Sequence, residues 1–402
     1  MKESTRGKRA SERRKGSGLE VKSDPLREIS SRMRLKEGEE AVRRVLREIY
    51  LHGKIGTKDL ARAARLPTPV TAAIRRELEK GGLVVRRGGA VLTEAGEKYA
   101  RDILGMIKED KPKSPSTEDK VAFSPEHETV LERLREHSRK RPRVDTSLDQ
   151  AYATPETALR RALYMLREGD LGGRRILFLG DDDLTSVAAA LLGGADAITA
   201  LDIDGRLLAV IKEISDEEGL DIECVLHDLR NPLPEGLRGT FDTFFTDPPY
   251  TLPGLRLFLS RGLEAIRPRK TAGVYLAFAD KPPLEMLKIH RAINEMGLFV
   301  GELIPRFNEY EGAEVLAGTT TQMRLITTEE SRPALRGKFT GRIYTGELRP
   351  LLRIYRCRCG KETRVGSSES FTTIEELKAK GCPSCGATEG FRLKSRRPQP
   401  PS

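Results

Sequence analysis

Seven short apolar segments, separated by stretches with helical periodicity, occupy the chain between Arg175 and Thr327. The segments are Ile176–Leu179, Ala197–Leu201, Glu223–Leu226, Thr243–Thr246, Gly273–Phe278, Gly301–Pro305 and Gln322–Thr327, and the helical stretches are Leu184–Leu192, Gly205–Glu218, Leu255–Ile266 and Pro283–Met296. Regular alternation of strand and helix with short connections predicts a parallel sheet with helices on both faces. Ligands of such an α/β sheet bind at the carboxyl ends of its strands.

The loop after the first strand carries carboxylates where a nucleotide-binding fold normally has glycines. Gly180 is followed by Asp181, Asp182 and Asp183. A glycine-rich loop lets backbone N–H groups approach an anion. Three neighbouring carboxylates favour a cation instead, so the sequence predicts a cation-binding loop at this strand end.

Acidic residues also close the next two strands. Asp202 ends the second strand, where a carboxylate accepts hydrogen bonds from the hydroxyls of an adenosine ribose. Asp204 is better placed as the N-cap of the following helix. Asp228 ends the third strand, where it could accept from the adenine amino group. An Asp after a strand is also a common turn residue, but acids at three successive strand ends predict an adenosine-bearing donor.

The fourth strand ends in Asp247-Pro248-Pro249-Tyr250. The carboxylate and a carbonyl freed by the rigid prolines can accept hydrogen bonds from an amine, while the Tyr ring packs on the body of the substrate. The nitrogen is thereby held with its lone pair facing an electrophile. A plain turn at the strand end is the structural alternative.

The central domain resembles the class I S-adenosylmethionine-dependent transferases, of which Asp-Pro-Pro-Tyr is the motif of the amino-methylating branch. Together, Gly180–Asp183, Asp149-Gln150, His227–Arg230 and Asp247–Tyr250 resemble one family in particular. That family is the branched-chain polyamine synthases of thermophiles, which are N4-bis(aminopropyl)spermidine synthases. The resemblance implies a Rossmann-like fold, decarboxylated S-adenosylmethionine as co-substrate and spermidine as acceptor. It implies donor contacts from Gly180, Asp202, Asp228, Asp149 and Gln150.

The chemistry of the donor agrees with this family. S-adenosylmethionine carries a carboxylate, which three Asp residues would repel, whereas the decarboxylated donor has two positive charges only. Each close unit-charge pair contributes about 1 to 4 kcal/mol at effective dielectric constants of about 80 to 20. We expect Asp181, Asp182 and Asp183 to orient and deprotonate the acceptor, and Asp247 and Tyr250 to hold it. The sequence does not single out the base among the three.

The segment Arg306–Tyr310 follows the sixth strand. It predicts either a lid over the acceptor or a loop that only closes the sheet.

The remaining sequence divides the 402 residues into further units. Thr154 and Pro155 predict the cap and first turn of the helix that opens the catalytic domain. The predicted units are a disordered basic tail (1–36), a winged-helix domain (37–107), a linker (108–123), a Rossmann-like catalytic domain (124–330), a zinc-ribbon-like module (331–394) and a disordered tail (395–402).

The winged-helix prediction rests on three short helical patterns followed by two short strands about a Gly-Gly turn. In a DNA-binding version, Arg75 and Arg76 would lie on the exposed side of the third helix, and Arg86 and Arg87 in the wing. Pro, Val and Ala at the start of that helix do not suit base reading. Dimer contacts or docking are the alternative use of this domain.

Four of the five cysteines form two close pairs, Cys357 with Cys359 and Cys382 with Cys385. Four thiolates at this spacing suit one tetrahedral, structural zinc ion. A redox disulfide or a lost metal site remains the alternative, because Cys-x-Cys is less usual than Cys-x-x-Cys. Cys224 is isolated.

Charge is unevenly distributed along the chain. Residues 151–330 contain 19 Lys/Arg and 29 Asp/Glu, although the whole chain has a net charge of +11. An acidic middle attracts a polycation such as spermidine, and the basic ends could contact nucleic acid. A nucleic-acid amino methyltransferase and a ligand-sensing transcription regulator are therefore the rival functions.

Location and assembly are expectations at this stage. No apolar run long enough for a membrane span and no secretory signal is evident, so we expect a cytoplasmic protein without a membrane partner. We also expect a homodimer.

Overall fold

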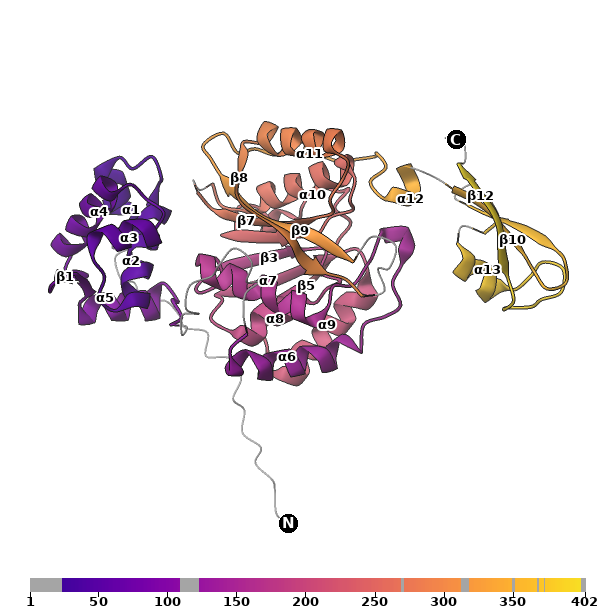
Figure 1. Ribbon diagram of the computed structural model, residues 1–402, viewed down its shortest axis with the longest axis horizontal. Coiled ribbons are helices and arrows are strands. Elements are labelled where there is room, and N and C mark those ends of the chain that lie inside the picture. The colour runs from indigo at the N-terminus through magenta and orange to yellow at the C-terminus, as the bar shows by residue number, and fades with distance from the viewer. Residues whose placement is uncertain are drawn as a thin grey trace, which may run out of the picture.

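The computed structural model describes residues 24–108, 123–268, 271–311, 318–348, 351–366, 369–371 and 373–398. Along the chain, an N-terminal helical domain is followed by a central α/β domain and a small C-terminal β module (Figure 1). Within these residues, no helix is long and apolar enough to cross a membrane.

The N-terminal domain contains the expected three helices, hairpin and closing helix. Its elements are α1 (Pro25–Met33), α2 (Glu39–His52), α3 (Thr57–Ala63), α4 (Thr68–Lys80), β1 (Val84–Arg86), β2 (Ala90–Leu92), α5 (Glu94–Lys98) and the π-helical turn η1 (Tyr99–Ile103). Leu46, Ile49 and Ile74 lie fully buried in its core.

Helix α1 shows that the predicted boundary of the basic tail at residue 36 was wrong. Asp24 caps the helix by accepting from the Leu26 backbone N–H, and Pro25 occupies its first turn. Leu26 and Ile29 then lie on one face and are buried in the domain core. The part of the predicted tail before Asp24 lies outside the described residues, as does most of the predicted linker.

The expected exposure of Arg75 was also wrong. Its side chain is buried and forms an ion pair with Glu79 one turn further along α4. Arg76, Arg86 and Arg87 are exposed, as expected.

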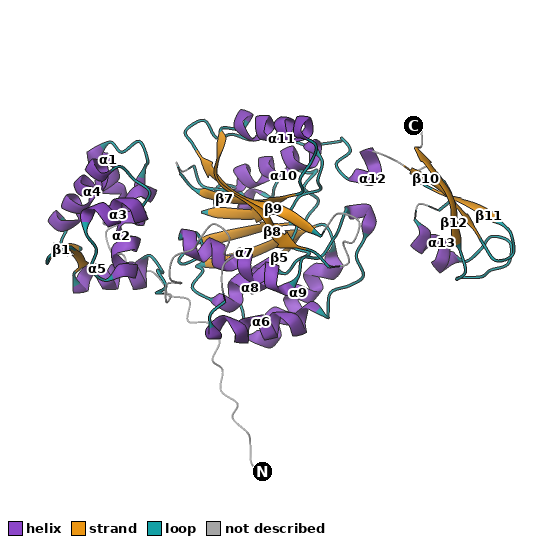
Figure 2. Cartoon of the chain, in the orientation of Figure 1, coloured by secondary structure: helices purple, strands orange, loops and turns teal. Residues whose placement is uncertain are grey.

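The central domain is a seven-stranded sheet with helices on both faces (Figure 2). The strand order is β5-β4-β3-β6-β7-β9-β8, which reverses direction between β3 and β6. The strands are β3 (Arg175–Leu179), β4 (Ala197–Asp202), β5 (Ile222–Leu226), β6 (Thr243–Thr246), β7 (Gly273–Phe278), β8 (Leu298–Glu309) and β9 (Thr319–Thr327).

Two apolar cores lie on opposite sides of this sheet. One contains the buried faces of α6 (Pro125–Ser138), α7 (Pro155–Glu168), α8 (Thr185–Leu192) and α9 (Gly205–Glu218), and the other those of α10 (Leu252–Ala265) and α11 (Pro283–Glu295). Single 3-10 turns, η2 (Thr146–Leu148) and η3 (Glu235–Leu237), complete the domain. The inner strands β3, β4, β6, β7 and β9 bury both faces, whereas the edge strands β5 and β8 are partly exposed. Burial of both faces explains the largely apolar sequences of β3, β4 and β7.

The sheet is not fully parallel, contrary to the sequence prediction. β9 pairs antiparallel with both β7 and β8. β8 and β9 are consecutive and joined by a short connection, and a short connection permits only antiparallel pairing.

The C-terminal module begins later than predicted. Residues 331–344 pack on the central domain, where Ile343 and Tyr344 belong to the core on the α10 side. The module proper contains β10 (Leu351–Arg356), β11 (Glu362–Val365), α13 (Ile374–Lys380) and β12 (Arg392–Pro398) after the short helix α12 (Thr345–Leu348). β12 pairs with β10 as far as Pro398, so the predicted disorder from residue 395 was also wrong up to that residue.

Candidate active site

A cavity lies at the carboxyl ends of β3, β4 and β6, where the strand order reverses. Its volume is about 80 Å³. It is lined by Leu148, Asp149, Gln150, Ala151, Gly180, Asp182, Asp202, Ile203, Asp247, Pro248, Pro249, Tyr250, Phe258, Tyr310 and Tyr344. Most residues predicted from the motifs are thus brought together.

The three consecutive carboxylates after β3 have three different environments. Asp181 is 1% exposed, and its carboxylate accepts from the Ser186 backbone N–H at 3.2 Å, which fastens the start of α8. Asp183 accepts from the Ala153 backbone N–H and pairs with Arg161 at 2.5 Å. Asp182 lines the cavity and forms no hydrogen bond or ion pair with another described residue. Only Asp182 is therefore available to a ligand.

The same loop has raised carboxyl pKa values. Burial raises the pKa of Asp181 to about 7. Burial, together with the carboxylates of Asp183 and Asp202, raises the pKa of Asp182 well above its ordinary value. A carboxylate with a raised pKa is a better proton acceptor near neutral pH.

Asp247, after β6, has one satisfied and one unsatisfied oxygen. Its Oδ2 accepts from Arg161 Nη2 at 2.7 Å and from the Tyr310 hydroxyl at 2.5 Å. Its Oδ1 is buried without a hydrogen-bond partner, and the side chain is 6% exposed. A buried, unpaired carboxylate oxygen is costly, so Oδ1 retains an unused capacity to accept a hydrogen bond. Burial raises the pKa of Asp247 to about 6, and Arg161 opposes that rise.

Arg161 connects the two acidic motifs and was not identified from the sequence. It projects from α7, which begins at the predicted cap Thr154, and its side chain is 0% exposed. Besides Asp183 and Asp247, its Nε donates to Asn308 Oδ1 at 2.8 Å. An arginine on the apolar face of a helix is the signal that could have indicated it.

Tyrosine hydroxyls extend this network across the cavity. Tyr250 donates to the Tyr310 hydroxyl at 2.9 Å, and the Tyr250 ring stands edge-on to Phe278. Tyr310 follows β8 directly, because Arg306 to Glu309 continue that strand beyond a bulge. Neither expectation for this segment, a lid or a closing loop, was correct for residues 306–309.

Of the predicted donor residues, all but Asp228 line the cavity. The Asp202 carboxylate accepts from the backbone N–H groups of Asp181 and Asp204 and borders the cavity. Asp204 is the N-cap of α9, as predicted. Asp228 does not line the cavity; its carboxylate accepts from the Arg230 backbone N–H at 2.9 Å.

Asp149 and Gln150 tie neighbouring segments together. The Asp149 carboxylate accepts from the Thr345 N–H at 2.6 Å, and the Gln150 amide donates to Asp204. Gly180 has a positive φ of 72°, which favours glycine at this sharp turn.

Tyr344 reaches the cavity from a segment that the sequence assigned to another module. The Thr251 hydroxyl donates to the Ile343 carbonyl at 2.6 Å. The Glu347 carboxylate accepts from the backbone N–H groups of Ile343 and Tyr344 and from Arg230. No local sequence pattern indicated this contact.

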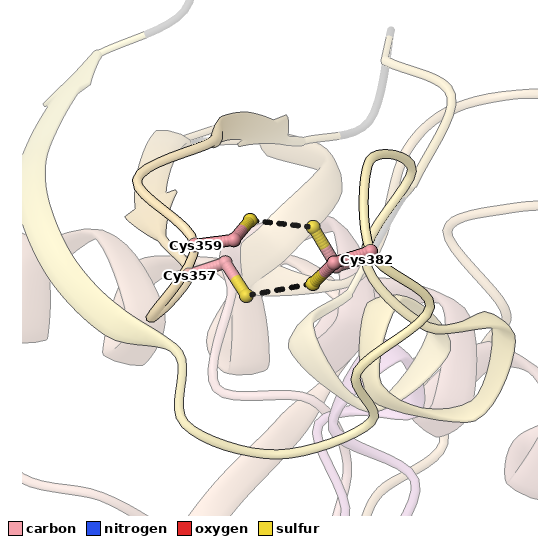
Figure 3. A group of neighbouring side chains, drawn as sticks. Cys357, Cys359 and Cys382 are labelled. Carbon is pink, nitrogen blue, oxygen red and sulfur yellow. Dashed lines mark hydrogen bonds between the residues drawn. The ribbon is translucent and has the colours of Figure 1, made fainter.

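The four paired cysteines form a compact cluster in the C-terminal module (Figure 3). Their sulfur atoms all lie within 4.8 Å of one another, and two Sγ–Sγ separations are 3.7 Å. A disulfide requires about 2.05 Å. Four sulfurs at about 2.3 Å from a tetrahedral metal would be about 3.8 Å apart, so the cluster fits a metal ion.

The fold and the site define a doubly wound α/β protein with an acidic cavity at the reversal of its strand order. Residues 129–375 match the family described as Branched-chain polyamine synthase A C-terminal domain. The chain belongs to this family of branched-chain polyamine synthases.

Named relatives include archaeal enzymes. N(4)-bis(aminopropyl)spermidine synthase of Thermococcus kodakarensis is 34% identical over 71% of this chain and 83% of that enzyme. The enzyme of the same name from Methanocaldococcus jannaschii is 35% identical over 61% of this chain and 70% of the enzyme. An uncharacterized protein of that organism is 42% identical over 88% of this chain and 89% of its own length.

A solved structure is similar in fold. It is the branched-chain polyamine synthase of Thermus thermophilus in complex with N4-aminopropylspermidine and 5′-methylthioadenosine. The TM-score is 0.51 with 27% sequence identity, over 79% of this chain and 96% of the Thermus chain.

Proposed function

We propose that the protein is an aminopropyltransferase. It moves aminopropyl groups from decarboxylated S-adenosylmethionine to the central nitrogen of spermidine and releases 5′-methylthioadenosine. The products are N4-aminopropylspermidine and then N4-bis(aminopropyl)spermidine. Family membership and the names of the relatives support this assignment.

One observation carries the proposal, the unpaired Oδ1 of Asp247 in the cavity wall. A carboxylate oxygen accepts only, so its partner must be an N–H or O–H donor. An amine held there lies beside the tyrosine hydroxyls and faces the wall of Asp202. We therefore assign Asp247 to acceptor binding and the wall of Asp202 to the adenosine part of the donor.

We assign Asp182 as the base. In the first transfer, the nitrogen lone pair forms a bond to the propyl carbon next to sulfur, the C–S bond electrons return to sulfur, and the nitrogen proton passes to Asp182. The second transfer forms a quaternary ammonium and releases no proton from nitrogen. The cavity contains Tyr250, Tyr310 and Tyr344, whose rings could stabilise that cation.

Donor selection follows from the same charges. Asp182, Asp202 and Asp247 border a cavity in which Arg161 is already paired with two carboxylates. No Lys or Arg of the described residues lines this cavity, so the carboxylate of intact S-adenosylmethionine would face other carboxylates there. We therefore expect the decarboxylated donor to bind and the intact donor to be rejected.

The direct test is incubation of the pure protein with either donor and with spermidine or an oligonucleotide, followed by mass spectrometry. One or two added aminopropyl units on spermidine are expected. Methyl transfer to the oligonucleotide, with polyamines unchanged, would refute the assignment. One organism has both an uncharacterized protein that is 42% identical to this chain and a named synthase that is 35% identical to it. The two could use different acceptors, so the acceptors tested should include N4-aminopropylspermidine and linear tetraamines.

For the cysteine cluster we propose one structural zinc ion. The ligands would be Cys357, Cys359, Cys382 and Cys385, which provide four sulfurs and leave no open coordination position. A closed site of this type stabilises a small module whose apolar core is limited.

For the N-terminal domain we propose a winged helix. The order of α2, α3, α4 and the β1–β2 hairpin supports it. The domain exposes Arg76, Arg86 and Arg87. In this proposal these side chains contact nucleic acid weakly, and the contact weakens as the salt concentration rises.

A further inference from the structure

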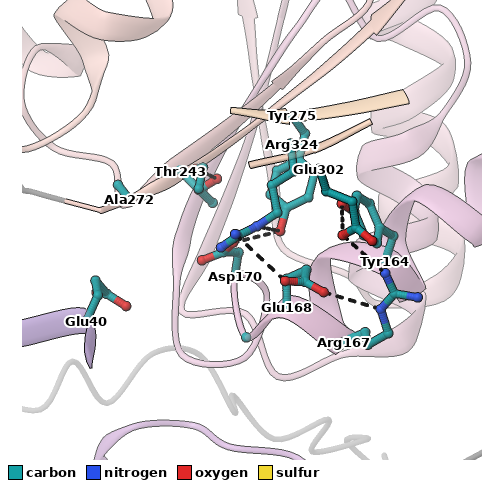
Figure 4. Close-up of polar contacts among 12 residues, drawn as sticks. Glu40, Tyr164, Arg167, Glu168, Asp170, Thr243, Ala272, Tyr275, Glu302 and Arg324 are labelled. Atoms are coloured by element: carbon teal, nitrogen blue, oxygen red, sulfur yellow. Dashed lines mark hydrogen bonds and ion pairs between the residues drawn. The ribbon is translucent and has the colours of Figure 1, made fainter. Parts of the chain in front are cut away.

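A second cavity of about 300 Å³ lies between the N-terminal domain and the central domain. It borders the amino ends of β3 and β7, at the edge of the sheet opposite the candidate active site, and the two cavities share no lining residue. Figure 4 shows part of its wall, where Arg324 lies between Asp170, Glu168 and Tyr275.

Both domains are held in contact around this cavity. Arg174 donates to both oxygens of Glu40, at 3.0 and 2.6 Å. Arg43 donates to the carbonyl oxygens of Leu104 and Gly172, at 2.9 Å each. A Cβ at Gly173 would lie 2.3 Å from the Leu104 carbonyl oxygen, so the two backbones are in close contact.

Most of the cationic side chains in the wall have a carboxylate partner. Arg174 pairs with Glu40, Arg324 pairs with Asp170 at 2.8 Å, and Arg65 pairs with Glu168 at 3.4 Å. Both carboxylates that the central domain contributes to the lining, Glu168 and Asp170, are therefore already paired.

Arg44 differs from these neighbours. It lines the cavity from α2, forms no hydrogen bond or ion pair with any described residue, and its Nε is buried without a partner. Burial and the nearby guanidinium of Arg324 lower the pKa of Arg44, and the carboxylates of Glu40, Asp170 and Glu168 only partly oppose this. A largely buried, unpaired cation is costly unless an anion accompanies it.

Apolar side chains form another part of the lining, beside the polar residues Glu37, Arg47 and Thr271. Leu66 and Pro67 precede α4, Phe299 projects from the edge strand β8, and Ile326 projects from its neighbour β9. Phe299 is 49% exposed although it is a large apolar side chain. The cavity volume falls at the lower end of the range for small-molecule sites.

We propose that this cavity binds a small organic anion. A phosphate or carboxylate group pairs with Arg44, and an apolar body packs on Phe299 and Ile326. Because residues of both domains contact such a ligand, binding stabilises the junction between them. This site is independent of the proposed aminopropyl transfer.

Isothermal titration calorimetry and thermal unfolding of the full-length protein test the proposal with three probes at constant ionic strength. Phenyl phosphate and phenylacetate each carry an anion and a ring, and benzyl alcohol is the neutral control. We expect binding by at least one anionic probe, and the stronger of the two identifies the preferred anionic group. Equal binding of benzyl alcohol, or no heat with either anion up to about 10 mM, would overturn it.

Arg44→Met removes the charge and keeps an apolar stem, and it should weaken the anionic probe about tenfold or more. Arg62→Met is the matched control, because Arg62 is an exposed residue of the same domain outside the cavity. Arg44→Lys should restore part of the affinity, and Phe299→Ser should reduce it without removing charge. Unchanged affinity of the anionic probe for Arg44→Met would contradict the site. An unchanged circular dichroism spectrum shows that the variant is folded. Retained aminopropyl transfer shows the same if the proposed function holds.

Discussion

At the scale of single residues, identical side chains in one loop acquire different roles from their partners. Asp181 is bound by a helix N-terminus and Asp183 by Arg161, so only Asp182 is left for a ligand. The two oxygens of Asp247 differ in the same way, because Oδ2 accepts from Arg161 and Oδ1 has no partner. Chemistry at this site therefore depends on which oxygens the protein has left unsatisfied.

Replacing Asp182 by Asn should slow the first aminopropyl transfer about 10² to 10⁴-fold, because the group that accepts the nitrogen proton is lost. The second transfer should slow much less at alkaline pH, where the central amine is largely neutral. Single-turnover assays with spermidine and with N4-aminopropylspermidine measure the two steps. Asp196→Asn, at an exposed Asp, is the control, and equal slowing of both steps would argue against Asp182 as the base.

Asp247 should control the acidic limb of the pH profile. Its pKa is about 6, so kcat/KM should fall as the pH drops through about 6 and the carboxylate becomes protonated. The Tyr310 hydroxyl donates to this carboxylate and lowers its pKa. Tyr310→Phe should therefore move the limb to higher pH, by about one unit. Tyr164→Phe alters a buried hydroxyl bound to Glu302 and should leave the limb in place.

At the scale of elements, the segment from Ile343 to Glu347 borders the candidate active site. Its tyrosine lines the cavity, and hydrogen bonds to Thr251 and Asp149 hold it down. The cavity volume of about 80 Å³ is below the usual range of small-molecule sites. We therefore expect this segment to move when both substrates bind.

Glu347→Ala tests this role, because it removes the acceptor of two backbone N–H groups and of Arg230. Loss of charge-assisted hydrogen bonds of this kind should raise KM about tenfold, with a smaller change in kcat. Steady-state kinetics for both substrates give the two constants. Glu330→Ala, an exposed acid on the preceding turn, is the control, and an unchanged KM in Glu347→Ala would show that the segment does not contribute to binding.

At the scale of the whole molecule, the residues that line the active-site cavity all precede the cysteine module. The module is basic, with eleven Lys/Arg and five Asp/Glu between Leu351 and Pro398, whereas the central domain is acidic. The candidate active site and the cysteine cluster are thus separate in the chain. The homodimer stays a prediction, for which light scattering should give twice the chain mass of 44.8 kDa.

Replacing Cys382 by Ser should reduce bound zinc from one equivalent to none, because a tetrahedral site would lose one of its four ligands. Metal analysis of the purified protein measures it, and thermal unfolding should lose a transition of the C-terminal module. Cys224→Ser, at the isolated cysteine, should keep the full metal content. Zinc retained in the Cys382 variant would refute the four-cysteine site.

Apolar periodicity and turn residues act locally, so they were sufficient to predict the order of the central strands and helices and the position of the two acidic motifs, although β8 is longer than predicted. β6, β7 and α9 were predicted with the residues that the structure has. Cysteine spacing likewise predicted the cluster, since each pair sits on one tight turn.

Only the tertiary structure decided which carboxylates remain free. Arg161 binds Asp183 and Asp247, which lie 22 and 86 positions further along the chain. Tyr344 enters the cavity from beyond the last strand, and β9 inserts antiparallel between β7 and β8. These contacts join distant segments, and periodicity within a short window carries no information about them.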